Sequence, residues 1–160
     1  MGAGKTYWGA KLASVAGFPF YDLDQAIEQH SSKTISQLFE ETGEEGFRKV
    51  EQEVLRSIAL QQDKFVMACG GGTPCFFDNL ELMKQLGVVV WIKPSPVTIK
   101  ERLLTEKTTR PLICHLNEKQ LDHFIQEKME AREPYYRQAH LVIDGEETDA
   151  VLVFKKIIDA

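Results

Sequence analysis

Ala3-Gly4-Lys5-Thr6, near the start of the 160-residue chain, is the stretch that decides the fold. Apolar residues follow it at helical spacing, namely Trp8, Leu12 and Val15. We therefore predict a helix over residues 5–16. Gly17 supplies its stop, because glycine readily adopts the left-handed conformation that ends many helices.

The tetrapeptide matches the second half of the phosphate-binding motif GxxxxGK(S/T). In that motif, backbone N–H groups and the positive end of a helix hold phosphate groups. Lys5 would reach the β- and γ-phosphates, and Thr6 would bind Mg²⁺. The tripeptide GK(S/T) is also common by chance, so a glycine-rich start before an ordinary amphipathic helix remains the alternative at this point.

Short apolar runs alternate with helical segments along the rest of the chain. Runs typical of buried parallel strands end at Asp22 and cover residues 65–69, 88–92 and 141–143. Further helices are predicted over residues 95–104, 117–131 and 151–158, and two more within residues 32–61, broken near Gly43. This alternation predicts a single α/β domain with a parallel sheet, spanning residues 1–160.

Two of these helices carry more specific signals. Asn117 and Gln120 have the spacing of a capping box, which predicts the start of their helix. In the second helix of residues 32–61, an apolar stripe predicts the core face and leaves Arg48 and Glu51 off it.

Composition narrows the functional classes. Lys and Arg total 19 against 24 Asp and Glu, a net charge of −5, which argues against nucleic-acid binding because neutralising phosphates needs a basic face. The longest plainly apolar stretch, residues 88–92, is far too short to span a bilayer. Three cysteines without CxxC spacing indicate free thiols in a reducing compartment, hence a cytoplasmic protein.

Three further features could carry chemistry, and each has an ordinary structural alternative. Asp22-Leu23-Asp24 would point its carboxylates to opposite sides of an extended backbone, whereas Asp-x-Asp is often only a turn. Gly70-Gly71-Gly72 would let a ligand approach the backbone, or would be a flexible turn. Arginine suits bidentate binding of carboxylate or phosphate, although a lone arginine is usually a surface residue; the candidates are Arg48, Arg110 and Arg132.

Residues 105–116 lack clean periodicity and carry two cations near their centre. An irregular connection of this length in a compact domain is more often a functional lid than a plain loop. We expect a lid at about residues 105–120.

The combination and order of these motifs resemble shikimate kinases over essentially the whole chain. The resemblance rests on Lys5-Thr6, Asp22 with Asp24, Phe47-Arg48 followed by Glu51, Gly70 to Gly72, Arg110-Pro111-Leu112 and Arg132-Glu133-Pro134-Tyr135-Tyr136. It implies a P-loop fold of three layers, α/β/α, with a five-stranded parallel sheet, a helical substrate-binding section at about residues 25–60, and the lid. The strand that would precede the phosphate loop, central in this fold, is missing from the chain. We therefore expect the natural protein to be longer by roughly ten residues, about one strand and half a loop.

The resemblance also implies an activity, in which the γ-phosphate of ATP passes to the 3-hydroxyl of shikimate on the chorismate route to aromatic amino acids. It implies Mg²⁺ as the metal, ATP as co-substrate and a protein that acts as a monomer. Another small-molecule kinase of the same fold, such as a gluconate kinase, and a nucleotide-binding regulator without catalysis remain the alternatives.

Site residues follow from the resemblance position by position. It implies catalytic roles for Lys5, Asp24 and Arg110, and Mg²⁺ contacts from Thr6 and, through water, Asp22. It implies nucleotide contacts from Gly2, Ala3, Gly4, Lys5, Thr6, Arg102 and Arg110. It implies shikimate contacts from Asp24, Arg48, Gly70, Gly71, Gly72 and Arg132, with Arg48 and Arg132 gripping the carboxylate and Gly71 donating a backbone N–H.

Overall fold

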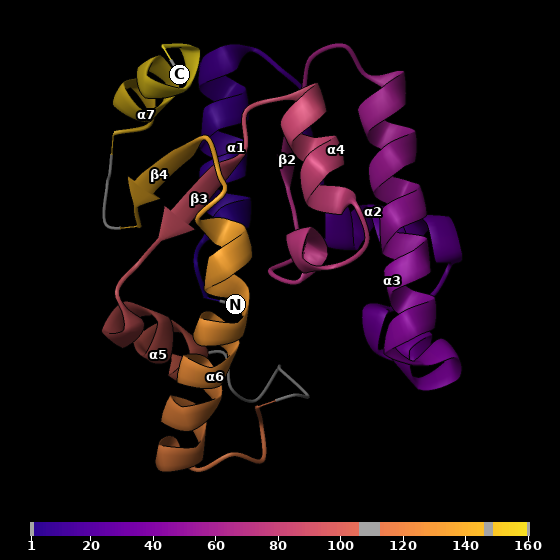
Figure 1. Ribbon diagram of the computed structural model, residues 1–160, viewed down its shortest axis with the longest axis vertical. Helices are drawn as coiled ribbons and strands as arrows, with labels where there is room; N and C mark the ends of the chain where they lie inside the picture. The colour runs from indigo at the N-terminus through magenta and orange to yellow at the C-terminus, as the bar shows by residue number, and fades with distance from the viewer. Residues whose placement is uncertain (1, 106–112, 146–148, 160) are drawn as a thin grey trace.

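The computed structural model describes residues 2–105, 113–145 and 149–159 (Figure 1). Its elements follow one another in the order α1 (Lys5–Ala16), β1 (Phe20–Asp22), α2 (Leu23–Ser31), α3 (Ile35–Gln61), β2 (Val66–Ala68), the 3₁₀ turn η1 (Thr73–Cys75), α4 (Asn79–Leu86), β3 (Val90–Lys93), α5 (Pro96–Thr105), α6 (Glu118–Tyr136), β4 (Leu141–Asp144) and α7 (Ala150–Ile158). Helices and strands therefore alternate as the sequence predicts.

Local signals placed several helix ends correctly. The helix α1 has the predicted bounds and stops at Gly17, whose φ of 68° is left-handed. The predicted capping box of α6 is present, since the Asn117 side chain accepts from the Gln120 N–H and the Gln120 side chain accepts from the Asn117 N–H. The break in α3 falls at Gly43, which has φ 68° and ψ −176°.

Other local predictions were wrong. The local sequence pattern did not predict the helix α2, which begins directly after Asp22, although the resemblance implies a helical section at about residues 25–60. The helix α6 continues past residue 131 to Tyr136 despite Pro134, which removes only one backbone N–H from the helical ladder. Val15 does not share the buried face of α1, because it lies near the end of the helix and is 39% exposed.

The described strands form two separate parallel pairs. β1 pairs with β2, with Phe20 opposite Val66, and β3 pairs with β4, with Val90 opposite Leu141. The parallel α/β architecture is confirmed. The expected count of five strands is not confirmed within the described residues, which contain four strands.

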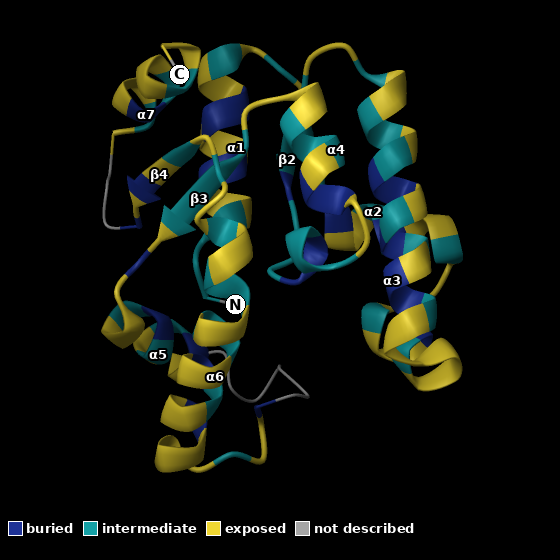
Figure 2. Cartoon of the chain, in the orientation of Figure 1, coloured by how far each residue is buried: buried dark blue, intermediate teal, exposed yellow. Residues whose placement is uncertain are grey.

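Helices cover both faces of the strands. On one face, a core of Trp8, Leu12 and Val153 from α1 and α7 packs against both strand pairs through Val66, Val90 and Ile143. On the other face, Met67 of β2 packs against a cluster on α2 and α3. Figure 2 shows the buried side of α3 turned toward the body of the protein and much of the outer surface of α6 exposed. These layers correspond to the α/β/α arrangement.

A cavity of about 520 Å³ separates the two strand pairs. Consecutive residues of β2 (Val66–Ala68) and of β3 (residues 90–93) line it, so it lies along the edge of each strand rather than on one face. The described residues of β1 and β4 do not line it. The expectation of an additional strand before the phosphate loop stays a prediction, and the intact mass of the natively expressed protein tests it.

Within the described ranges, no helix is both long and apolar enough to cross a membrane. Cys69 and Cys75 are free thiols, as predicted.

Candidate active site

The phosphate loop leads directly into α1. Gly2 and Gly4 have φ values of 64° and 78°, a left-handed conformation that favours glycine. Gly4 is the N-cap residue, and no side chain among the described residues caps α1 at this position. The first turn of α1 also contains no acidic residue. The N–H groups of the first turn and the positive end of the helix are therefore suited to an anion.

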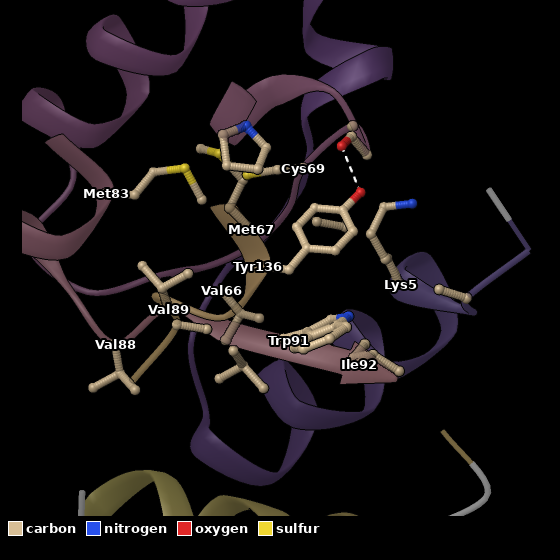
Figure 3. Close-up of a pocket in the computed structure, with 18 of the residues that line it drawn as sticks. Lys5, Val66, Met67, Cys69, Met83, Val88, Val89, Trp91, Ile92 and Tyr136 are labelled. Carbon is tan, nitrogen blue, oxygen red and sulfur yellow. Dashed lines mark hydrogen bonds between the residues drawn. The ribbon is translucent and has the colours of Figure 1, made fainter. Parts of the chain in front are cut away.

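The side chain of Arg102 reaches this loop from α5. Its Nη1 donates to the Gly2 carbonyl at 3.0 Å and lies beside Gly4, where an added Cβ would be 3.5 Å away. Ala3 and Lys5 line the adjoining cavity, and Figure 3 places Lys5 on the first turn of α1 at one end of it. The predicted loop residues and Arg102 are thus brought together.

Thr6 and Asp22 meet at the carboxyl end of β1. The Thr6 hydroxyl donates to Asp22 Oδ2 at 2.7 Å, and Asp22 Oδ1 accepts from the N–H groups of Asp24 and Gln25 at 3.1 and 3.4 Å. Asp22 therefore caps α2. The expectation of an extended backbone from Asp22 to Asp24 is wrong, because this cap starts the helix at the end of the strand and places Asp24 in its first turn.

The pair Thr6 and Asp22 suits a magnesium ion. Hydroxyl and carboxylate oxygens are hard ligands, and Mg²⁺ is usually held by one or two protein groups together with waters and substrate phosphates. The pair lies beside Lys5 at the start of α1, where the phosphate groups are expected. The residues present therefore fit the implied metal.

Asp24 has an unusual electrostatic environment. Partial burial raises the pKa of its carboxyl group, the negative charges of Asp22 and Glu51 raise it further, and the positive charge of Lys5 opposes them. An added Cβ on Gly70 would lie 3.5 Å from Asp24 Oδ1. Asp24 therefore faces both the phosphate loop and the triple glycine.

Arg48 is buried, contrary to the prediction that it lies off the core face. It is 8% exposed and Glu51 is 0% exposed. The Arg48 Nη1 donates to Glu51 Oε2 at 2.7 Å, and the Thr73 hydroxyl donates to Glu51 Oε1 at 2.7 Å. Apolar periodicity could not anticipate this, because two buried charges are tolerated when they are paired and hydrogen-bonded.

Aromatic rings flank the Arg48 guanidinium. Its Cζ lies 4.9 Å from the ring centre of Phe47 and 4.2 Å from that of Phe76, distances at which a cation is attracted to an aromatic face. Its Nε is buried without a hydrogen-bond partner among the described residues. A buried donor of this kind is costly unless a ligand satisfies it.

The triple glycine passes directly over Arg48. An added Cβ on Gly72 would lie 2.5 Å from Arg48 Nη2, and one on Gly70 would lie 3.1 Å from Glu51 Oε1. Gly72 has φ −90° and ψ −20°, which other residues also adopt, so close approach rather than backbone conformation requires glycine. The interpretation as a merely flexible turn is therefore wrong.

Replacing Gly72 by alanine is expected to displace the guanidinium of Arg48. Overpacking of this kind costs about 1–3 kcal/mol, so we expect a melting temperature lower by roughly 2–12 °C and weaker binding of any anion held by Arg48. Thermal denaturation and ligand titration measure both. Gly87→Ala is the control, because nothing lies within 4 Å of the added Cβ there; equal effects of the two substitutions would contradict the account.

Arg132 approaches the same region from α6. It lines the cavity. Burial raises the pKa of the Cys75 thiol, while the positive charges of both Arg132 and Arg48 lower it. Both arginines are therefore near enough to Cys75 to influence its thiol. That Arg48 and Arg132 hold one carboxylate stays a prediction.

Arg110 and residues 106–112 of the expected lid (residues 105–120) lie outside the described residues. The last residues of the expected lid, 118–120, belong to α6. Cys69 lies next to the triple glycine in the sequence. Burial raises the pKa of its thiol to about 12, so the reactive thiolate is scarce at neutral pH.

Sequence reasoning did not assign roles to Glu51, Thr73 and Tyr136. Glu51 could have been found, because its spacing of three from Arg48 places both on one side of a helix. Thr73 and Tyr136 had no comparable signal, since their partners Glu51 and Gly71 are 22 and 65 residues away in the chain.

Comparison with protein families finds one that covers the whole chain. The family described as shikimate kinase matches residues 1–160. The shikimate kinase of Parabacteroides distasonis is 43% identical over 146 residues, which is 91% of this chain and 84% of that protein. The shikimate kinase of Phocaeicola vulgatus is 40% identical over 93% of this chain and 85% of that protein.

Solved structures agree with the sequence comparison. The crystal structure of shikimate kinase from Bacteroides thetaiotaomicron has a TM-score of 0.91 and 34% identity, covering 100% of this chain and 94% of that one. Shikimate kinase from Acinetobacter baumannii in complex with shikimate has a TM-score of 0.83 and 33% identity, covering 99% and 87%.

Proposed function

The chain belongs to the shikimate kinase family, and we propose that the site described above transfers the γ-phosphate of ATP to the 3-hydroxyl of shikimate, giving shikimate 3-phosphate and ADP. The observation that carries this proposal is the buried Nε of Arg48, a donor without a protein partner in the described residues, beside the triple glycine. A carboxylate placed there would satisfy it. The gluconate-kinase and inactive-regulator alternatives are not favoured by the relatives.

Arg48 and Arg132 would hold the carboxylate of shikimate. Arg48 is fixed by Glu51 and by two aromatic rings, so little freedom is lost when the ligand binds. The substrate would also accept a hydrogen bond from the backbone N–H of Gly71. Gly70 and Gly72 have no side chains that would keep the substrate away from this N–H.

The phosphate loop would hold ATP at the other side of the site. Phosphoryl transfer depends on positioning and on neutralising the charge of the moving group. Lys5 and the N–H groups of Gly2, Ala3 and Gly4 would hold the phosphates, Arg102 would lie near the adenine, and Arg110 would close over the reacting phosphate. Thr6 and Asp22 would hold Mg²⁺, which when bound neutralises charge on the phosphate oxygens.

Asp24 would orient the attacking hydroxyl. It lies in the first turn of α2 between the phosphate loop and Gly70, so its carboxylate faces both substrates. Its raised pKa brings its basicity nearer to that of a useful proton acceptor at neutral pH. Asp24 is therefore the candidate to orient the 3-hydroxyl and accept its proton.

Phosphorus NMR of the reaction mixture tests the proposed reaction. With ATP, Mg²⁺ and shikimate, we expect the signal of one new phosphate ester. The coupling between its phosphorus and the proton on carbon 3 assigns the ester to the 3-hydroxyl. An ester at another hydroxyl, or release of inorganic phosphate alone, would refute the proposed transfer.

Replacing Arg132 by alanine is expected to raise the KM for shikimate by roughly 10- to 100-fold, the loss expected for a hydrogen bond between charged groups. The KM for ATP should stay unchanged. Steady-state kinetics with each substrate varied measures both values. Arg137→Ala is the control, because Arg137 lies on the same helix end with a side chain 71% exposed and paired only to Glu133 in the described residues; equal damage to both substrates would contradict this division of roles.

We also propose that the enzyme works as a monomer in the cytoplasm. The resemblance to the family implies a monomer. The free thiols of Cys69 and Cys75 suit a reducing compartment.

A further inference from the structure

The backbone of the triple glycine is held through all three of its carbonyl groups. The Gly70 carbonyl accepts from the Thr73 N–H at 3.1 Å, and the Gly72 carbonyl accepts from the Cys75 N–H at 2.8 Å. The Gly71 carbonyl accepts from the Tyr136 hydroxyl at 2.6 Å. The outer two bonds lie within one turn, whereas the central one comes from a distant helix.

Tyr136 itself is fixed within the wall of the cavity. Its ring lies 5.6 Å from that of Trp91 on β3, at an angle of 46°. Figure 3 shows the phenol reaching from this contact to the loop, with the hydrogen bond to Gly71 drawn as a dashed line. Trp91 therefore limits the positions from which the hydroxyl can reach the glycines.

Tyr136 also lies on the same face of α6 as Arg132. The two residues are four positions apart, so their side chains are neighbours on the helix. Burial raises the pKa of the Tyr136 phenol and the charge of Arg132 opposes this, which also indicates that the two groups are close. The hydroxyl stays protonated at neutral pH and can donate throughout the reaction.

We propose that Tyr136 is a positioning residue, which joins the central glycine to the helix that carries Arg132, so that the backbone donor of Gly71 and the Arg132 guanidinium grip one carboxylate together. Without this hydrogen bond, the glycine loop and α6 would each keep their own structure, but their positions relative to each other would no longer be fixed. The inference rests on the proposed function, because it assigns the gripped carboxylate to shikimate.

Tyr136→Phe is the decisive variant, since it removes only the hydroxyl and keeps the ring against Trp91. We expect the KM for shikimate to rise about tenfold, the loss of one hydrogen bond of ordinary strength, with kcat and the KM for ATP nearly unchanged. Tyr135→Phe is the matched control, because Tyr135 is the adjacent residue and is 38% exposed.

A second substrate separates positioning from general loss of structure. In the shikimate analogue that carries a hydroxymethyl group in place of the carboxylate, Arg132 has no anion to grip. The effect of Tyr136→Phe on KM should then fall to about twofold or less, as in a double-mutant cycle.

Three outcomes would overturn the inference. A Tyr136→Phe enzyme with the wild-type KM for shikimate, an equal loss with both substrates, or a lowered melting temperature with a parallel loss of kcat would each assign Tyr136 no role or only a structural one. Absence of shikimate turnover in the wild-type enzyme would instead refute the proposed function itself.

Discussion

Replacing Lys5 by alanine is expected to lower kcat by roughly 100-fold or more, the effect of removing one preorganised group that stabilises transition-state charge. Lys5 begins α1 directly after the left-handed Gly4, and we propose that its ammonium group contacts the γ-phosphate. The KM for shikimate should change little, because the contacts proposed for shikimate come from other residues. Single-turnover measurement of ADP formation gives the chemical rate without product release.

Lys11→Ala is the control for this variant. Lys11 is also on α1 and is exposed, and its ammonium lies 4.4 Å from the ring centre of Tyr7. It should keep the wild-type rate. A Lys5→Ala enzyme that retains a comparable rate would remove the phosphate loop from the proposed mechanism.

Asp24→Asn is expected to lower kcat by roughly 100-fold or more, the contribution typical of a positioned acid–base group. The same change should leave the melting temperature at neutral pH equal or higher. The folded protein raises the pKa of Asp24, so its ionised form is less favourable in the folded chain than in the unfolded chain and lowers stability at neutral pH. Kinetics and thermal denaturation of the same sample measure both effects.

The raised pKa of Asp24 also predicts the shape of the pH profile. If the carboxylate must be ionised, kcat falls as the pH drops through the pKa of Asp24, which lies above the pKa of an ordinary aspartate. This acidic limb should disappear in Asp24→Asn. Glu53→Gln, an equivalent change at a side chain 68% exposed, should keep the wild-type profile; a lost limb in this control would assign the titration to another group.

Local chemistry made much of the fold predictable. Gly17, Gly43 and the Asn117 capping box each act within one helical turn, so their effects can be derived from neighbouring residues alone. A local signal also marks the start of α2, because aspartate, here Asp22, is a favoured N-cap residue. The apolar run before Asp22 favoured the prediction of an extended backbone instead.

The site was harder to predict because its charges are buried. The rule that apolar residues face the core placed Arg48 and Glu51 outside, whereas the structure pairs them inside and adds Thr73 to the pair. Only the tertiary structure brings residues from α3 and η1 together. The resemblance to a family singles out Arg48 as a shikimate contact, because a motif carries information about partners that periodicity lacks, and this assignment stays a prediction.

The triple glycine illustrates the same limit. From the sequence, Gly70 to Gly72 could be either a flexible turn or a point of close approach. The structure decides in favour of close approach, because the guanidinium of Arg48 occupies the space that a Cβ on Gly72 would need. The group that comes close is thus a side chain of the protein, which no local pattern around the glycines indicates.

Initial-rate measurement of ADP release from ATP and Mg²⁺, with shikimate, gluconate or a nucleoside monophosphate as acceptor, tests the central claim most directly. The account predicts ADP release that depends on shikimate, with at most background rates for the other two. ADP release driven by gluconate or a nucleoside monophosphate, or nucleotide binding without any shikimate-dependent release, would contradict it.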